Sequence, residues 1–204
     1  MSQPSHPFKV ICFDLGGVLI DISGAESFLK DIHYQGKLAD FWYEWLLCPA
    51  VKQFESGQID AQAFVEGVVA YFKLSVSAAA FKASYTTWVR GSLEGAEALL
   101  DELKGGYQIA CLSNTNTLHW PDVEATGLLS RIDHVFTSFE LGAVKPDLAI
   151  YQKMLKQLNV PAHQVYFIDD NQINVDAARE AGLHAHKAVG IEAVRAVLAF
   201  DEVI

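Results

Sequence analysis

Residues 8–17 read FKVICFDLGG. This short, largely apolar run ends in an acid, Asp14, which is followed closely by the glycine pair Gly16-Gly17. An apolar run of this length that stops at turn residues predicts a strand buried on both faces. Because a carboxylate stands at its end, the strand also marks a candidate site.

Later runs of the same kind predict further strands at 107–112 (YQIACL), 134–137 (HVFT), 165–168 (VYFI) and 184–189 (HAHKAV). Segments with the apolar spacing of helices lie between them, at 96–104, 151–158 and 174–181. We expect Asp147 to cap the second of these helices, and Gly182 to follow the third as its C′ glycine. Strands that alternate with helices predict an α/β fold with a doubly wound, Rossmann-like parallel sheet.

The stretch from residue 23 to 90 is different, because it is rich in aromatic residues and contains no convincing strand. Helical patterns occur at 60–72 and 76–88. We therefore expect an all-helical cap at 23–90, inserted after the first strand, and an α/β core made of 1–22 and 91–204. Such an insertion emerges at the carboxyl edge of the sheet, where ligands bind in open α/β folds, so it can act as a lid.

Composition narrows the class of protein. Hydrophobic residues make up 51% of the 204 and charged residues 20%, which favours a folded domain with a large core over disorder. The net charge of −10 disfavours a nucleic-acid partner, and it means that an anionic ligand needs a local cation. The three cysteines form no Cys-x-x-Cys pair, and no signal peptide or membrane-length apolar run is present, so we expect free thiols, no membrane partner and a cytoplasmic location.

Polar groups follow several of the predicted strands. Asp14 follows the first, Ser113-Asn114 the second, Lys145 comes after the third, and Asp169-Asp170 ends the fourth. Each motif taken alone is more often a turn, a helix cap or a solvated loop. In a parallel sheet, however, these strand ends share one edge, so together they predict a composite site.

This set of groups suits phosphoryl transfer. A carboxylate repels a phosphate ester, and a divalent cation held by Asp14 and the Asp169-Asp170 pair would remove that repulsion. Mg²⁺ suits such oxygen ligands. Lys145, Ser113 and Asn114 can hold the phosphoryl oxygens, and Gly17 lets the backbone approach them. Asp14 would then form an aspartyl-phosphate that water hydrolyses.

The motifs FDLGGVL, LSNTN, KPD and FIDDNQINVDAA resemble, in order, those of the haloacid-dehalogenase-like (HAD) hydrolase superfamily. Within it the chain is most similar to small sugar-phosphate phosphatases such as α-D-glucose-1-phosphate phosphatase. The resemblance implies a Mg²⁺-dependent phosphatase acting on a small phosphorylated substrate. The implied roles are nucleophile (Asp14), phosphoryl binding (Ser113, Lys145), metal binding (Asp14, the Gly16 carbonyl, Asp170), support of the metal site (Asp169, Asn174) and substrate contact (Gly17, Asn114, Asn116, Glu55).

One position departs from the family pattern. The acid that usually stands two residues after the nucleophile, and that moves a proton to the leaving group, is replaced by Gly16. General acid–base help is typically worth ~10²–10⁴-fold, so we expect a preference for good leaving groups, such as sugar 1-phosphates. His119, Asp21 and Glu55 are candidates for supplying the proton instead.

Two other functions remain open at this point. A haloacid dehalogenase would use the same aspartate without Mg²⁺, although such enzymes usually carry Tyr at the position of Gly16. A non-catalytic binding or regulatory module would keep the fold with weakened chemistry, yet it would not need Asp14, Ser113, Lys145 and Asp170. The sequence fixes neither the physiological substrate nor the oligomeric state.

Overall fold

The computed structural model describes residues 7–32, 34 and 36–204. Its main sheet has the order β5-β4-β1-β6-β7, with every neighbouring pair parallel. The strands are β1 (Val10–Phe13), β4 (Gln108–Ser113), β5 (His134–Thr137), β6 (Val165–Asp169) and β7 (His184–Lys187). These bounds lie within two residues of the predicted ones, and the α/β, Rossmann-like class is confirmed.

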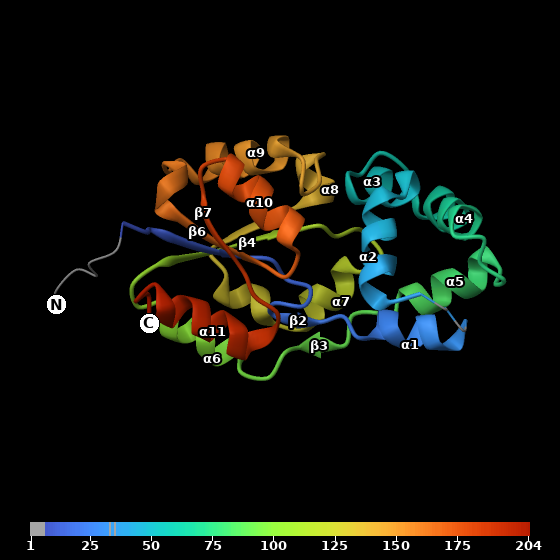
Figure 1. Cartoon of the computed structure of the whole chain (residues 1–204), viewed down its shortest axis with the longest axis horizontal. Coiled ribbons are helices and arrows are strands. Elements are labelled where there is room, and N and C mark those ends of the chain that lie inside the picture. Colours follow the sequence, from blue (N-terminus) through green and yellow to red (C-terminus); the bar gives the residue numbers. More distant parts are fainter. Residues whose placement is uncertain (1–6, 33, 35) are drawn as a thin grey trace.

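Strand β1 lies at the centre of the sheet and is buried on both faces. Ile11 and Phe13 pack against α6 (Ala96–Leu103) and α11 (Gly190–Phe200). Val10 and Cys12 face the other way, toward α9 (Leu148–Leu158) and α10 (Gln172–Glu180). Helices therefore cover both faces of the sheet (Figure 1), which explains why β1 is a continuous apolar run and not an alternating one.

The order of the strands also shows where a ligand should bind. From β1 the chain runs outward through β4 and β5, then returns to the other side of β1 for β6 and β7. In open α/β sheets, ligands bind outside the carboxyl ends of the strands at such a reversal. This point lies directly after Phe13, at Asp14.

The thiols of Cys12 and Cys111 lie on opposite faces of the sheet. Their strands are neighbours, with Phe13 paired to Cys111, but Cys12 packs in one core cluster and Cys111 in the other. All three cysteines are free and buried. The expectation of free thiols is therefore confirmed.

Of the two predicted helix caps, the structure confirms one and contradicts the other. Gly182 follows α10 with a φ of +89°, as expected for a C′ glycine. Asp147 precedes α9 at the N-cap position, but its side chain makes no capping hydrogen bond, so the predicted cap was wrong. The carboxylate instead pairs with Lys52, at 2.9 Å.

The chain between β2 (Ile20–Asp21) and β3 (Gly91–Ser92) is helical in the part that the structure describes. It contains α1 (Gly24–Asp31), α2 (Leu38–Leu47), α3 (Pro49–Glu55), α4 (Ala61–Tyr71) and α5 (Ala78–Tyr85). Strands β2 and β3 pair antiparallel, so the segment leaves and rejoins the sheet region at one place. It lies beside the carboxyl edge of the sheet (Figure 1) and has its own aromatic-rich core cluster. The exact division into a 23–90 cap and a two-part core stays a prediction.

The remaining elements are short. They are α7 (Trp120–Ala125), η1 (Leu128–Arg131), α8 (Ser138–Leu141) and η2 (Ala162–Gln164). Among the helices of the described chain, none combines the length and the apolar character needed to cross a bilayer.

Candidate active site

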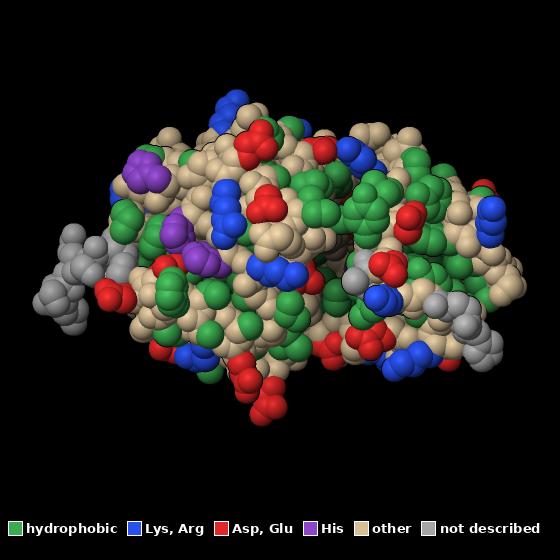
Figure 2. All heavy atoms as spheres, viewed as in Figure 1, with side chains coloured by type: hydrophobic (Ala, Val, Ile, Leu, Met, Phe, Trp, Pro, Cys, Tyr) green, Lys and Arg blue, Asp and Glu red, His purple; other side chains and the backbone are tan. Residues whose placement is uncertain are grey.

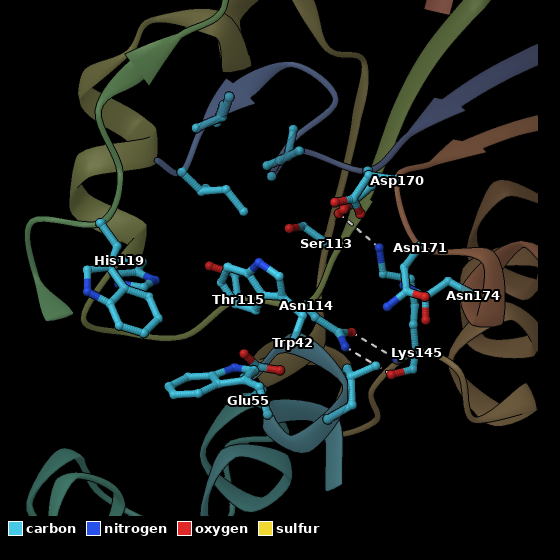
Figure 3. Close-up of a pocket in the computed structure, with 18 of the residues that line it drawn as sticks. Trp42, Glu55, Ser113, Asn114, Thr115, His119, Lys145, Asp170, Asn171 and Asn174 are labelled. Atoms are coloured by element: carbon cyan, nitrogen blue, oxygen red, sulfur yellow. Dashed lines mark hydrogen bonds and ion pairs between the residues drawn. The ribbon is translucent and has the colours of Figure 1, made fainter. Parts of the chain in front are cut away.

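The predicted strand-end residues meet at one pocket. Asp14, Ser113, Lys145 and Asp170 all line a cavity of about 410 Å³. The backbone of Asp14 is tied to β6, because its N–H donates to the carbonyl of Ile168 at 2.7 Å. Figure 3 shows Asp170, Ser113 and Lys145 on the side of the pocket formed by the sheet edge.

Lys145 is the cation at the centre of this arrangement. Its side chain is only 1% exposed, and its Nζ lies 2.8 Å from Asp14 Oδ1 and 2.6 Å from Asp169 Oδ2. Burial opposes the charge, but the two carboxylates outweigh that effect and raise the pKa of Lys145. The ammonium is therefore charged at neutral pH and holds both carboxylates in place.

Asn114 fixes the backbone that carries Lys145. The Asn114 Nδ2 donates to the carbonyl of Lys145 at 2.9 Å, and its Oδ1 accepts from the Lys145 N–H at 2.8 Å. This pair of bonds ties the end of β4 to the loop between α8 and α9. The side chain also lines the pocket, so its predicted contact with substrate stays a prediction beside this positioning role.

The acidic groups outnumber the cations at this site. Asp14, Asp169 and Asp170 each offer a carboxylate oxygen, and these oxygens lie within 4.8 Å of one another. Lys145 contacts Asp14 and Asp169, which leaves Asp170 without a cation among the residues that the structure describes. Burial raises the pKa of both Asp14 and Asp170, and the neighbouring carboxylates add to the increase. An additional positive charge would relieve this repulsion.

An unpaired acceptor supports the same conclusion. Asn174 donates from Nδ2 to both oxygens of Asp169, at 3.0 and 3.1 Å. Its own Oδ1 is buried and has no hydrogen-bond partner in the described chain. Oxygen ligands in excess of cations, with a spare acceptor beside them, fit hydrated Mg²⁺, which usually keeps several of its waters.

Comparison with known proteins places this chain in a family. A model of haloacid dehalogenase-like hydrolases matches residues 8–182. The chain belongs to the haloacid dehalogenase-like hydrolase family.

Relatives of known function are similar along most of their length. A sesquiterpene phosphatase, astK, of Aspergillus oryzae is 30% identical, over 86% of this chain and 87% of the relative. A D-ribitol-5-phosphate phosphatase of Bacteroides thetaiotaomicron is 26% identical, over 85% of this chain and 88% of the relative.

Solved structures show the same fold. The HAD family enzyme BT-2542 of Bacteroides thetaiotaomicron, in complex with magnesium and inorganic phosphate, has a TM-score of 0.69 at 25% identity and covers 88% of this chain and 93% of its own. The L-2-haloacid dehalogenase PA0810 has a TM-score of 0.64 at 24% identity, over 89% of this chain and 85% of its own, a likeness of fold alone.

Gly17 lies beside Asp170, one of the predicted metal ligands. Gly17 has a φ of +72°, and a Cβ placed there would lie 2.8 Å from Asp170 Oδ2. We expect Gly17→Ala to displace the Asp170 carboxylate and to weaken Mg²⁺ binding by roughly 10–100-fold, as disturbed supporting contacts commonly do. Isothermal titration calorimetry with Mg²⁺ measures this change.

Gly127→Ala is the matched control for that variant. Gly127 has nearly the same φ, +75°, but a Cβ there meets no atom within 4 Å. The control carries the backbone strain without the contact. Equal Mg²⁺ affinity in the two variants would contradict the assignment of Asp170 as a ligand.

The three candidates for the proton donor differ in their position at the pocket and, for Glu55 and His119, in the direction of the pKa shift. Glu55 is buried and lines the pocket, and burial raises its pKa to about 8, although the Trp45 side chain donates to it. His119 also lines the pocket, but burial lowers its pKa to about 4, and its Nε2 lies 2.7 Å from the carbonyl of Tyr85. Asp21 does not line the pocket, and its Oδ1 accepts from the Ser23 N–H at 2.7 Å.

Three other predicted residues make contacts that support the site, and of these only Asn174 lines the pocket. Asn116 does not line the cavity: its Nδ2 donates to the Tyr85 hydroxyl at 2.7 Å, and its Oδ1 accepts from the N–H groups of Leu118 and His119. The geometry thus gives Asn116 a loop-fixing role and offers no support for substrate contact. Asp169 pairs with Lys145, and Asn174 donates to Asp169, so their predicted supporting roles stay consistent with the contacts.

Sequence reasoning missed one part of the wall. Thr115 lines the pocket, and its backbone is held by Ser138, whose hydroxyl accepts from the Thr115 N–H and donates to its carbonyl, both at 3.0 Å. The aromatic side chains of Trp42, Trp45 and Trp88 also line it. The sequence gives no signal that separates these rings from ordinary helix-packing aromatics.

Proposed function

We propose that this protein is a Mg²⁺-dependent phosphatase that hydrolyses a small phosphate monoester through an aspartyl-phosphate on Asp14. The observation that carries the proposal is the position of Asp14 at the pocket wall, within 2.8 Å of a buried ammonium and close to Asp170. Family membership supports hydrolytic chemistry. The phosphatases among the relatives, and the fold relative that holds magnesium with phosphate, support the choice of a phosphoryl group.

Asp14, Lys145 and Ser113 have separate roles in the proposed reaction. Asp14 attacks the phosphorus atom, and the alcohol of the ester leaves. Lys145 is held 2.8 Å from the attacking carboxylate, so it is placed to bind a phosphoryl oxygen as well as to orient Asp14. Ser113, at the end of β4, offers a hydroxyl to another oxygen. Water then attacks the phosphorus of the aspartyl-phosphate and releases Asp14 as a carboxylate.

Asp14, Asp170 and the Gly16 carbonyl would hold the cation, with Asp169 and Asn174 beside them. When bound, Mg²⁺ offsets the repulsion between carboxylates and substrate and polarises the phosphoryl group. Gly16 lines the pocket two residues after Asp14, so its backbone carbonyl is available to the cation.

Glu55 is the residue best placed to replace the missing acid at Gly16. It keeps its proton below its pKa of about 8, whereas His119, with a pKa of about 4, is neutral at pH 7 and uses Nε2 for the Tyr85 carbonyl. The proton would pass from the Glu55 carboxyl to the oxygen of the departing alcohol, and the Glu55 carboxylate would take a proton back from the water that attacks the aspartyl-phosphate.

This assignment gives a pH dependence. Since Glu55 is protonated below pH 8 and ionised above it, kcat/KM for an alkyl phosphate should fall as the pH rises through about 8. Glu55→Gln should abolish this fall in kcat/KM above pH 8 and lower kcat on alkyl phosphates by roughly 10²-fold. Acetyl phosphate, whose leaving group needs no proton, should be little affected. Glu124→Gln, on the exposed face of α7, is the control.

The dehalogenase alternative has only fold similarity to support it. Phosphate release from acetyl phosphate, with Mg²⁺ and with EDTA, tests the proposed function directly, and halide release from 2-chloropropionate in EDTA tests the alternative. Halide release without phosphatase activity would overturn the proposal. The sugar-phosphate subgroup expected from the sequence stays a prediction.

A further inference from the structure

The pocket has two chemically different ends. The end at the sheet edge carries Asp14, Ser113, Lys145 and Asp170. The other end is walled mainly by hydrocarbon and aromatic side chains: Trp42, Trp45, Leu46, Tyr85 and Trp88. His119 lies at this end in Figure 3, away from Asp170 and Lys145. The cavity of about 410 Å³ is within the range of small-molecule sites, so it has room for more than a phosphate.

The polar atoms of Tyr85 and His119 at the aromatic end are already engaged, and Trp88 Nε1, which has no partner in the described chain, is buried. The Tyr85 hydroxyl accepts from Asn116 Nδ2 at 2.7 Å, and the Tyr85 ring stacks on His119 with centroids 3.9 Å apart. His119 Nε2 lies 2.7 Å from the Tyr85 carbonyl. A sugar bound here would bury hydroxyl groups with few free partners, and buried polar groups left unpaired are costly.

This end of the pocket also carries little charge at neutral pH. Burial raises the pKa of Glu55 to about 8, and burial lowers the pKa of His119 to about 4, so both side chains are mostly neutral at pH 7. The polar lining residues Asn171, Gln172 and Lys187 belong instead to the side of the sheet edge: the first two follow β6, and Lys187 is the last residue of β7. The leaving group of a substrate held by Asp14 would therefore meet a neutral, apolar wall.

The apolar surface continues to the outside of the helical segment. Tyr43, on α2, lines the pocket and is 53% exposed. Figure 2 shows further hydrophobic side chains on the helical segment beside the hollow that separates it from the sheet. A long hydrocarbon group can therefore extend from the pocket along this surface.

We propose that the substrate is the phosphate monoester of an apolar alcohol, whose hydrocarbon part packs against Trp42, Trp45, Leu46 and Trp88 while its phosphate binds beside Asp14. This inference rests on the proposed phosphatase function and adds the class of the leaving group. It is an alternative to the sugar phosphate expected from the sequence.

A matched series of substrates tests the inference. In ethyl, butyl, hexyl and octyl phosphate the reacting bond stays nearly the same and only the buried area changes. We expect kcat/KM to rise with each methylene, by up to about fourfold while the chain still enters the pocket. Hexyl phosphate should exceed sorbitol 6-phosphate, which has the same six-carbon skeleton with five hydroxyl groups, by at least about tenfold.

A pair of neighbouring leucines gives the matched variants. Leu46 lines the pocket, whereas Leu47 is 53% exposed and does not line it. Leu46→Ser should lower the ratio of kcat/KM for hexyl phosphate to that for acetyl phosphate by roughly tenfold, and Leu47→Ser should leave this ratio unchanged. Binding to Asp14→Asn, followed by tryptophan fluorescence, should show hexyl phosphate bound more tightly than sorbitol 6-phosphate.

Hydrolysis of acetyl phosphate distinguishes a failure of the phosphatase function from a failure of the inference about the leaving group. If it is hydrolysed with Mg²⁺ but the alkyl series is flat, or sorbitol 6-phosphate matches hexyl phosphate, the apolar leaving group is overturned and the phosphatase stands. If Asp14→Asn binds both six-carbon esters equally, the inference fails as well. If no phosphate is released from acetyl phosphate or from any of the phosphate esters, the proposed function and this inference both fail.

Discussion

Asp14→Asn is expected to lower phosphate release on the order of 10³-fold or more, while leaving the protein folded and able to bind phosphate. The carboxylate is the only group in the proposed mechanism that bonds to phosphorus, and a neutral amide does not replace it as a nucleophile. The amide oxygen can still accept from Lys145, which lies 2.8 Å from Asp14 Oδ1 in the native site. The loss should therefore appear in kcat, measured by continuous phosphate release.

Binding gives the second half of this prediction. Removing one carboxylate reduces the negative charge that an incoming phosphate meets, so the Kd for inorganic phosphate, measured by calorimetry at a Mg²⁺ concentration that saturates the variant, should stay equal or decrease. Asp101→Asn is the control, because Asp101 is an exposed residue of α6 whose pair with Arg131 contributes little. Asp14→Ala guards against slow return of the acid by deamidation. Retention of more than about a tenth of the activity in both Asp14 variants would contradict a nucleophilic role and favour the non-catalytic module.

The elements of the sheet were predictable because their signals are local. Strand β1 is buried on both faces, and its run of apolar residues shows this directly. Gly182 could be placed after α10 because a positive φ favours glycine. The two-residue strands β2 and β3 have no such signal, since a ladder of this length leaves no periodicity to detect.

The site residues that stand at strand ends were predictable from the sequence. The hydrogen-bond and ion-pair partners of other side chains were not. The parallel sheet brings Asp14, Ser113 and Asp170 to one pocket, as the motif order implies. Asp147, however, stands at the helix end that the pattern indicates and still pairs with Lys52, which is 95 residues away along the chain. Asn116 likewise bonds to Tyr85, a partner that no local pattern shows.

The aromatic residues of the helical segment show a further limit. Phe64 and Phe81 are fully buried in its core, whereas Trp42 and Trp88 line the pocket as well as packing against each other. Helical spacing gives the face on which a ring lies but not which neighbour will cover that face. The shape of the substrate pocket therefore depends on how α2 and the chain after α5 meet the sheet edge, which is tertiary information.

Lys145→Met should be the most destabilising change at the site, because it removes the buried cation that contacts Asp14 and Asp169. Removing one partner of a buried ion pair typically costs about 3–5 kcal/mol, since the remaining charge is left uncompensated. Urea unfolding without Mg²⁺ measures this loss, and activity should fall on the order of 10³-fold because a phosphoryl oxygen loses its ammonium partner. Lys156→Met, on the exposed face of α9, is the control.

The pH dependence of that loss identifies its cause. Burial already raises the pKa of Asp14, and Lys145 is the neighbour that lowers it, so the variant should have a still higher folded-state value. A carboxyl whose pKa is higher in the folded than in the unfolded state, about 4, destabilises the fold as the pH rises through that interval. The stability difference from wild type should therefore be smaller at pH 5 than at pH 8. Adding Asp169→Asn to Lys145→Met removes one of the uncompensated charges and should restore part of the stability, because the Asn171 N–H and Asn174 Nδ2 can still donate to an amide oxygen at that position. A loss that is independent of pH and unchanged in the double variant would show that Lys145 acts through packing and not through its charge.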